Sequence, residues 1–379
     1  MDFDLSEERQ ALRKQLEGFC QRELNEDRVA ALEAASTYPQ DLHQAMAAAG
    51  ILGYCLPQNL GGSGGTMQDL VLINEVLGAH SASAVNIFFI NMACGAILTF
   101  AGSKEQKTHY LPKLASGELK FAFALTEANA GSDAGAIRST SRPDGDGFVI
   151  NGEKLYTTGA ADADFILTVV RSNDEERASR GSSLFLVPTN SDGLDIQPMD
   201  KLAGNAVASC RVLYNDLKVA PTQLVGGEHQ GWGFLMMTAG VERLTIAASC
   251  VGSAQQVLAS LLQHVKSREQ FGQAIGRFQS VQHQLVDIAT EIEAMRLLTW
   301  RAAWLADKGG APIREICMAK LYSTERMNEI VQKGMRLMGG QAYFTDHPMQ
   351  RIMRESVLGL YAGGTCEIQR NMIAKSLGL

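Results

Sequence analysis

Residues 123–133 read FALTEANAGSD, and the chain changes there from helical patterns to β-type patterns. On the N-terminal side, Ser6 is placed to cap a helix with an acidic first turn. Residues 41–49 predict a further helix, which ends at Gly50. On the C-terminal side, short runs of β-branched and aromatic residues alternate with turn-type Asp-Gly and Asn-Gly pairs. We therefore predict a helical segment followed by a β domain of roughly a hundred residues.

The predicted β domain contains several short strands. They are expected at residues 148–150, 154–158, 165–170, 183–187 and 211–213. Asn151-Gly152 is interpreted as a turn between the first two strands, and the charged residues 173–181 as an exposed hairpin loop.

Apolar residues return at helical spacing after Trp232. A stripe typical of a bundle helix is formed by Val281, Leu285, Ile288, Ile292, Met295 and Thr299, which lie three and four apart. Residues 308–312 interrupt this pattern, and a further helix is predicted over residues 313–338, ended by Gly339-Gly340. The predicted order is therefore helices, β domain, helix bundle.

The composition is that of an ordinary globular protein. The 34 Lys and Arg against 41 Asp and Glu give a net charge of −7, which is no reason to expect a nucleic acid or an anionic membrane as partner. Seven cysteines lack CxxC spacing, so neither a disulfide framework nor a metal site is expected. The acidic N-terminus is unlike a signal peptide, and Asn, Ser or Gly breaks the apolar runs short of a bilayer span. We expect a cytoplasmic protein without an integral membrane segment.

The run at residues 123–133 has the residue types that a flat ligand needs. Its small residues and Gly131 let the backbone approach a ligand closely, while Thr126 and Ser132 carry hydroxyl donors. Taken alone, the run also fits a simple turn after a strand. It is followed by REQFGQAIGRFQ at 268–279, in which Arg offers a fork for a pyrophosphate and Phe a face for adenine.

Together with RLMGG at 336–340 and YAGGTCEIQR at 361–370, these runs make the chain resemble the FAD-dependent acyl-CoA dehydrogenase family. The first run is similar to the family signature TEPxAGSD, with Ala128 in place of Pro. The resemblance covers nearly the whole chain and implies that the cofactor is FAD. It implies an α+β multidomain fold with an N-terminal helical domain (1–120), a central antiparallel β-barrel-like domain (121–225) and a C-terminal four-helix bundle (226–379).

The resemblance also implies which residues contact FAD. These are Phe123, Leu125, Thr126, Gly131, Ser132, Tyr156, Thr158, Arg268, Phe271, Ile275, Phe278, Gln279, Arg336, Gly340, Thr365 and Glu367. Tyr156 and Thr158 are expected on the same side of a regular strand. The segment beginning at Arg268 matches the one that reaches the FAD of a neighbouring subunit, which implies a homotetramer or homodimer.

The position of the catalytic base departs from the commoner family pattern. Many members read EGTSEIQR near the C-terminus, with the first Glu as base, but this chain has Gly363 there. It has Glu242 before Arg243 instead, like isovaleryl-CoA and long-chain acyl-CoA dehydrogenases and crotonobetainyl-CoA reductase. The resemblance implies that Glu242 is the base, while Ser132, Arg243 and the backbone N–H of Gly363 serve the thioester substrate. A solvent-facing Glu242 beside Arg243 is the alternative from the helix pattern alone.

The implied reaction is α,β-dehydrogenation of an acyl-CoA to trans-2-enoyl-CoA, with electrons passed to an electron-transfer flavoprotein. Three alternatives stay open: an enoyl-CoA reductase that runs the same chemistry backwards, a flavin oxidase or monooxygenase, and a non-catalytic flavoprotein. Asn86 and Asn91 lie in an otherwise apolar segment. They indicate either paired amides in a buried helix or a pocket for a short or polar-tailed acyl group.

Overall fold

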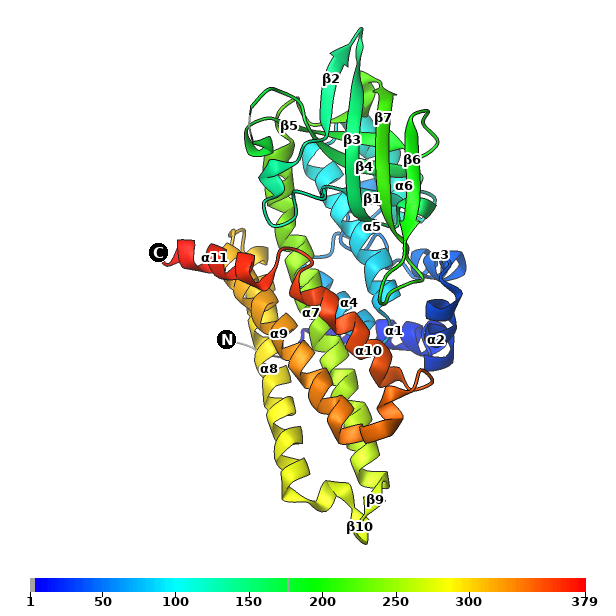
Figure 1. The fold of residues 1–379 in the computed structure, drawn as a ribbon, viewed down its shortest axis with the longest axis vertical. Coiled ribbons are helices and arrows are strands. Elements are labelled where there is room, and N and C mark those ends of the chain that lie inside the picture. Colours follow the sequence, from blue (N-terminus) through cyan, green and yellow to red (C-terminus); the bar gives the residue numbers. More distant parts are fainter. Residues whose placement is uncertain (1–3, 176) are drawn as a thin grey trace. The chain divides into compact units, whose positions relative to one another are not determined.

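The computed structural model describes residues 4–175 and 177–379, and the chain forms two compact units (Figure 1). Unit 1 contains the chain up to Glu33, Thr66–Val85 and Arg243–Leu379. Unit 2 contains Ala34–Gly65 and Asn86–Glu242. Each unit therefore combines part of the N-terminal helical segment with later elements. The domain boundaries expected at residues 120 and 225 stay predictions.

Unit 1 is helical. It holds α1 (Glu7–Glu23), the start of α2 (Glu26–Ala35), α4 (Met67–Gly78), most of α7 (Gly231–Ser267), α8 (Gln279–Asp307), α9 (Ile313–Met338), α10 (Pro348–Ser356) and α11 (Cys366–Ser376). Ser6 caps α1 as predicted, since its hydroxyl accepts from the Arg9 N–H. The bounds of α9 are those predicted, because Pro312 precedes the helix and Gly339 follows it with a φ of 69°.

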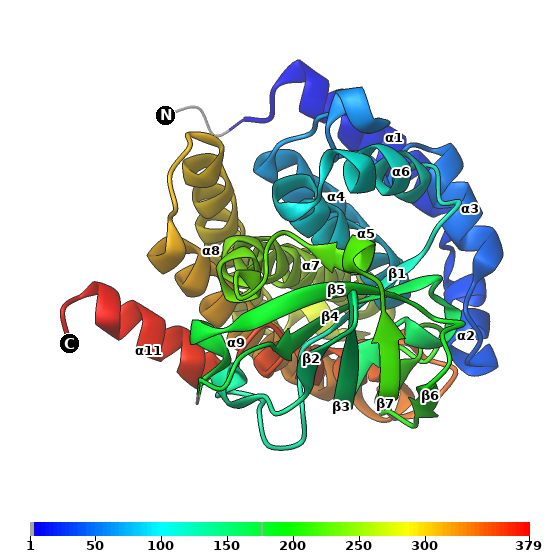
Figure 2. The same cartoon turned by 90° about the horizontal axis from the view of Figure 1, so that it is seen from above.

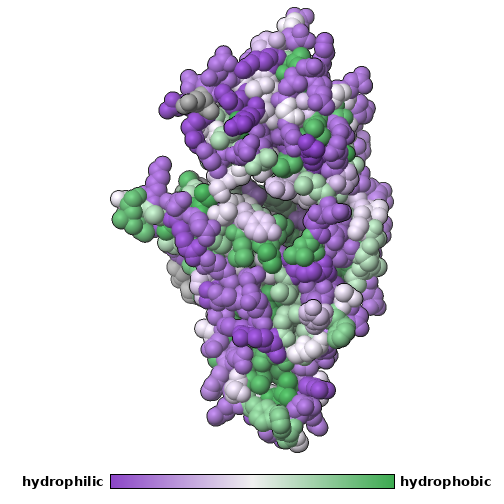
Figure 3. Space-filling view, in the orientation of Figure 1, coloured by the Kyte–Doolittle hydropathy of each residue, from purple (hydrophilic) through white to green (hydrophobic). Residues whose placement is uncertain are grey.

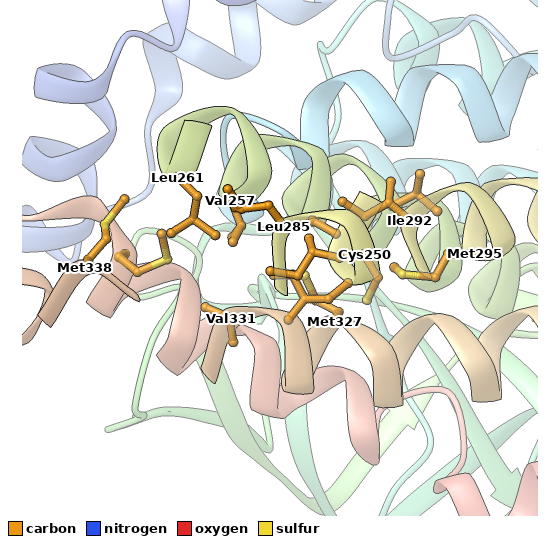
Figure 4. Packing of buried hydrophobic residues seen from close by; sticks show 14 of the residues in the cluster. Cys250, Val257, Leu261, Leu285, Ile292, Met295, Met327, Val331 and Met338 are labelled. Atoms are coloured by element: carbon orange, nitrogen blue, oxygen red, sulfur yellow. The ribbon is translucent and has the colours of Figure 1, made fainter. Parts of the chain in front are cut away.

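The core of unit 1 lies between α7, α8 and α9 (Figure 4). The stripe predicted on α8 faces this core: Leu285, Ile292 and Met295 are buried against Met327 and Val331 of α9. Burial of each such side chain contributes about 1.5–3 kcal/mol, which is why spacing of three and four residues selects the inward face of the helix.

Unit 2 is built on an eight-stranded sheet. Its strands are β1 (Phe121–Ala124), β2 (Thr140–Asp144), β3 (Gly147–Thr158), β4 (Phe165–Arg171), β5 (Ser182–Pro188), β6 (Leu194–Met199), β7 (Ser209–Val219) and β8 (Leu224–Val225). The order is β6-β7-β3-β2-β4-β5-β8, mostly antiparallel, with β1 parallel to β4 (Figure 2). Unit 2 also holds α3 (Gln40–Ala48), most of α5 (Ala82–Ala101) and α6 (Lys104–Ala115).

The prediction of a turn at Asn151-Gly152 is wrong. Both residues lie inside β3, where the pairing with β7 is irregular between Ile150 and Gly152. The Asn151 side chain bonds the Asp216 backbone and carboxylate at 2.8 and 2.9 Å, which ties the irregularity to β7. A side chain at position 152 would meet the Ser139 Oγ at 2.3 Å, so the glycine permits close packing rather than a chain reversal.

Helices α5 and α7 are both long and apolar enough to cross a membrane by length and composition, so the expectation that all apolar runs are too short was wrong. In α5, 67% of the apolar window is buried, as is usual for core helices of this composition. The buried amide of Asn91 donates to the Leu52 and Leu114 carbonyls at 2.8 and 3.2 Å. The paired-amide interpretation is thus confirmed for Asn91.

Candidate functional site

In unit 2, the run at residues 123–133 leaves the sheet at the end of β1 and starts a loop that returns at β2. The Leu155 N–H donates to the Thr126 carbonyl at 2.8 Å, so the loop begins directly beside the Tyr156 region of β3. Backbone bonds between Glu127 and Ala130 then fold the loop tightly. The fold therefore brings together Thr126 and Tyr156, two predicted FAD contacts that lie 30 residues apart in sequence.

Tyr156 lies in an irregular part of β3, and the buried Thr157 separates it from Thr158. The pairing with β7 shifts between Lys154 and Thr157, and Tyr156 has a φ of 59°. This left-handed conformation is a genuine outlier for an aromatic residue, and such strain gathers at functional sites. The tyrosine side chain is 62% exposed. The half-buried Thr158 follows, with its hydroxyl 3.3 Å from the Ser209 hydroxyl.

The other predicted flavin contacts of unit 2 leave room for a flat group. Phe123, Leu125 and Thr126 are half-buried, whereas Gly131 and Ser132 are exposed. A Cβ added at Gly131 would meet nothing within 4 Å. An open backbone, several hydroxyls and an exposed aromatic ring are the donor set that a flavin ring requires, so these residues fit FAD.

A buried ion pair beneath this loop was missed in the sequence. The Lys154 Nζ lies 2.8 Å from the Glu127 Oε1, and Lys154 is fully buried. Burial lowers the pKa of Lys154 to about 8, although Glu127 opposes that shift. Burial acts to raise the pKa of Glu127, but Lys154 and the N–H donors around the carboxylate outweigh it and the pKa is lowered. The sequence signal that could have indicated this pair is Lys154, a lysine at an inward-facing position of the predicted strand 154–158.

In unit 1, side-chain donors fix the loop 361–364 through hydrogen bonds to its backbone carbonyls. The Gly363 carbonyl accepts from the Arg243 Nε at 3.3 Å and from the Gln369 Nε2 at 3.1 Å. The Gly364 carbonyl accepts from the fully buried Lys320 at 2.8 Å and from Gln369 at 3.0 Å. Within the part of the chain that the structure describes, the Gly363 N–H donates no hydrogen bond. That N–H is therefore available to an outside acceptor.

Glu242 and Arg243 are consecutive residues of α7, and both are half-buried. Glu242 is therefore neither fully exposed nor fully buried. The Arg243 Nε donates to the Gly363 carbonyl, so Arg243 is tied to the loop at the position where many family members have their base.

The predicted adenine-side residues gather at the end of unit 1 that carries the hairpin β9 (Glu269–Gln270) and β10 (Gln273–Ala274) (Figure 1). Phe271 at the hairpin tip is 94% exposed, with its ring 6.3 Å from that of Phe278. Figure 3 shows apolar surface around this end, and Tyr343 and Phe344 are also exposed.

Three cations of unit 1 have no acidic partner among the residues that the structure describes. Arg268, Arg277 and Arg336 are exposed, and none forms an ion pair with any residue in 4–175 or 177–379. Ile275 is half-buried, while Gln279 and Gly340 are exposed. Such unpaired guanidinium groups next to exposed rings suit a pyrophosphate and an adenine.

The last two predicted contacts flank the start of α11. Thr365 is its N-cap, and its hydroxyl accepts from the Ile368 N–H at 3.2 Å. Glu367 is exposed in the first turn, 3.9 Å from Arg370. The Thr365 hydroxyl is therefore already used as a helix cap.

Comparisons with known proteins agree with this arrangement. The N-terminal, middle and C-terminal domain models of acyl-CoA dehydrogenase match residues 6–118, 122–217 and 229–378. A probable acyl-CoA dehydrogenase of Bacillus subtilis, YngJ, is 33% identical, with 100% of each chain covered. The CarC subunit of the caffeyl-CoA reductase–Etf complex of Acetobacterium woodii is 32% identical, with 98% of each chain covered.

Solved structures show the same three-domain fold. Butyryl-CoA dehydrogenase from Megasphaera elsdenii has a TM-score of 0.95 at 26% identity, with 100% of each chain covered. The FAD complex of PigA has a TM-score of 0.95 at 28% identity, again over 100% of each chain. These matches confirm the predicted fold class and FAD as the cofactor: the chain belongs to the acyl-CoA dehydrogenase family.

Proposed function

We propose that the protein catalyses FAD-dependent α,β-dehydrogenation of an acyl-CoA thioester to trans-2-enoyl-CoA, with Glu242 as the base. The observation that carries the proposal is the hydrogen bond from the Arg243 Nε to the Gly363 carbonyl. It joins the residue after Glu242 to the loop in which many family members hold their base. In this proposal the carboxylate of Glu242 reaches the same α-carbon that the glutamate at position 363 reaches in those family members.

In this mechanism the chain's own residues move a proton and stabilise charge. The Glu242 carboxylate accepts the α-proton, and exclusion of water by the acyl chain raises the basicity of that carboxylate. The Gly363 N–H donates to the thioester oxygen as enolate charge develops. FAD, when bound, would supply the hydride acceptor for the β-carbon. Thr126, Ser132, Tyr156 and Thr158 would hold the flavin ring, and Ser132 and Arg243 would also orient the thioester.

Anaerobic mixing with a panel of acyl-CoAs tests the proposal. Bleaching of the flavin absorbance by a saturated acyl-CoA is the expected result. No bleaching by any member of the panel would favour a non-catalytic flavoprotein, and rapid oxygen consumption in air would favour an oxidase or monooxygenase. The panel also identifies the acyl group that the site accepts.

A reductase is the second candidate, since a relative at 32% identity is the CarC subunit of the caffeyl-CoA reductase–Etf complex. The same relative supports an electron-transfer flavoprotein as redox partner of this chain. Flavin reduced with dithionite should be reoxidised by an enoyl-CoA if the enzyme works in this direction. Faster turnover of enoyl-CoA with reduced partner than of acyl-CoA with oxidised partner would decide for the reductase.

We also propose that two subunits complete each FAD site, in a homotetramer or homodimer. Arg268, Arg277 and Arg336 lack acidic partners in the described residues, and Phe271 is almost fully exposed. A pyrophosphate and adenine from a neighbouring subunit's cofactor would satisfy both features. A monomer that retains stoichiometric FAD in sedimentation would contradict the shared site. The cytoplasmic location expected from the sequence stays a prediction.

A further inference from the structure

The ion pair between Glu127 and Lys154 lies at the base of the flavin loop and bonds to the loop's backbone there. The Lys154 Nζ donates both to the Glu127 Oε1 at 2.8 Å and to the Leu125 carbonyl at 2.9 Å. The two charged side chains are 0% and 9% exposed. No other charged pair of unit 2 that the structure describes is buried to this extent.

The Glu127 carboxylate also joins the two ends of the loop. It accepts from the backbone N–H groups of Arg138 and Ser139 at 2.5 and 3.0 Å. Arg138 and Ser139 end the loop, whereas Leu125 and Thr126 begin it, so one carboxylate and one ammonium group close a loop of residues 125–139. Gly131 and Ser132 lie inside this closed loop.

Stability alone does not account for the pair. Removing two charges from water is costly, and well-packed apolar replacements of buried pairs are often neutral or stabilising. What apolar residues cannot replace is the set of bonds to the Leu125 carbonyl and to the N–H groups of Arg138 and Ser139. These bonds fix the backbone conformation of the loop rather than add to the core.

We propose that Glu127 and Lys154 are positioning residues for FAD: they hold loop 125–139 in the shape that receives the flavin ring. The inference rests on the proposed flavin contacts of Leu125, Thr126 and Ser132. Both charged side chains are buried and bonded to the loop's backbone, so they act through that backbone and not by touching the cofactor. Without them, binding must order several loop residues, and the cost of that ordering appears as weaker FAD affinity.

A double variant separates positioning from stability. Glu127→Leu with Lys154→Met removes both charges and leaves neither buried alone. We expect the melting temperature of the apoprotein to stay within about 4 °C of the parent, since neither charge is left buried alone and the released backbone groups bind water once the loop opens. The dissociation constant for FAD, measured by quenching of flavin fluorescence, should rise about ten- to a hundredfold. The vibrational structure of the bound flavin absorbance band should also be lost.

The neighbouring pair Glu153 and Arg211 supplies the matched control. It joins β3 to β7 at 2.7 and 3.0 Å, but both side chains are about 40% exposed. Glu153→Leu with Arg211→Met should leave FAD affinity and the flavin spectrum at parental values, because exposed pairs contribute little.

Parental FAD affinity in the Glu127→Leu, Lys154→Met variant would overturn the proposal. If that variant does not fold, Glu127→Gln decides: it keeps the side-chain shape, and a parental flavin spectrum and affinity would equally overturn the proposal. Neither readout depends on turnover. A parent that binds FAD but is not bleached by any acyl-CoA would refute the proposed reaction and leave the loop inference intact.

Discussion

Glu242→Gln is the most direct test of the proposed base, because it keeps the size and hydrogen-bonding shape of the side chain but cannot accept the α-proton. General base catalysis contributes about 10²–10⁴ in rate, which corresponds to about 2.7–5.5 kcal/mol of barrier. The Arg243 bond to the Gly363 carbonyl does not involve residue 242, so the loop and its N–H donor should be kept. FAD and acyl-CoA binding are therefore expected to be parental.

The assay is anaerobic stopped-flow reduction of the flavin by the best acyl-CoA of the panel. Glu293→Gln is the control, because Glu293 is exposed on α8 and the same substitution there should leave the rate unchanged. Near-parental flavin reduction in Glu242→Gln would refute the reasoning and direct the search to Glu367.

Moving the carboxylate back tests the same idea from the other side. The double variant Glu242→Gly with Gly363→Glu should recover part of the lost rate. Gly363 has a φ of 65°, a conformation that costs a residue with a side chain about 1–2 kcal/mol. That strain and misplacement of the carboxylate by an ångström, which can cost about a hundredfold, limit the recovery. A rate equal to that of Glu242→Gln would show that position 363 does not face the α-carbon.

Three further perturbations have defined outcomes. Arg268→Ala should weaken FAD retention about tenfold or more through loss of a charge-assisted bond, measured by flavin release on dilution, and undiminished retention would contradict its role. Gln369→Leu removes the donor shared by the Gly363 and Gly364 carbonyls and should lower the free energy of unfolding by about 1–3 kcal/mol in urea titration. Burial raises the pKa of Glu355 from 4.5 to about 7, so the unfolded chain loses this proton first. The free energy of unfolding should therefore fall by up to about 3 kcal/mol as the pH rises from 4.5 to about 7. A Glu355→Gln variant whose free energy of unfolding has the same dependence on pH would contradict this.

The fold could be predicted where the residues of a single helix are enough to define its buried face and its ends. The stripe on α8 and the bounds of α9 follow from local rules, because helical spacing selects a buried face and Pro312 and Gly339 stop the chain from continuing. Asn151-Gly152 failed because its partners, Ser139 and Asp216, come from other parts of the sheet. Asn-Gly usually reverses the chain, but here the glycine lets Ser139 pack closely against β3.

The candidate site could be predicted only as a list of residues. The motif residue Thr126 does lie beside the Tyr156 region, because its carbonyl accepts from the N–H of Leu155, the residue before Tyr156. The conformation of Tyr156 could not be foreseen, since a φ of 59° depends on the irregular pairing of β3 with β7. Glu127 and Lys154 also escaped prediction, because a charge pair 27 residues apart is recognisable only after both partners are buried.

The exchange of base positions in the proposed mechanism follows from what a backbone donor requires. The N–H of residue 363 needs a fixed orientation but no side chain, and its carbonyl is fixed by Arg243 and Gln369. A glycine with a φ of 65° satisfies that requirement with less strain than any larger residue. Once a carboxylate on α7 supplies the base, position 363 is left with the donor role alone. Glycine is then the residue that suits the loop best, and the missing glutamate is evidence for a relocated base rather than for a lost activity.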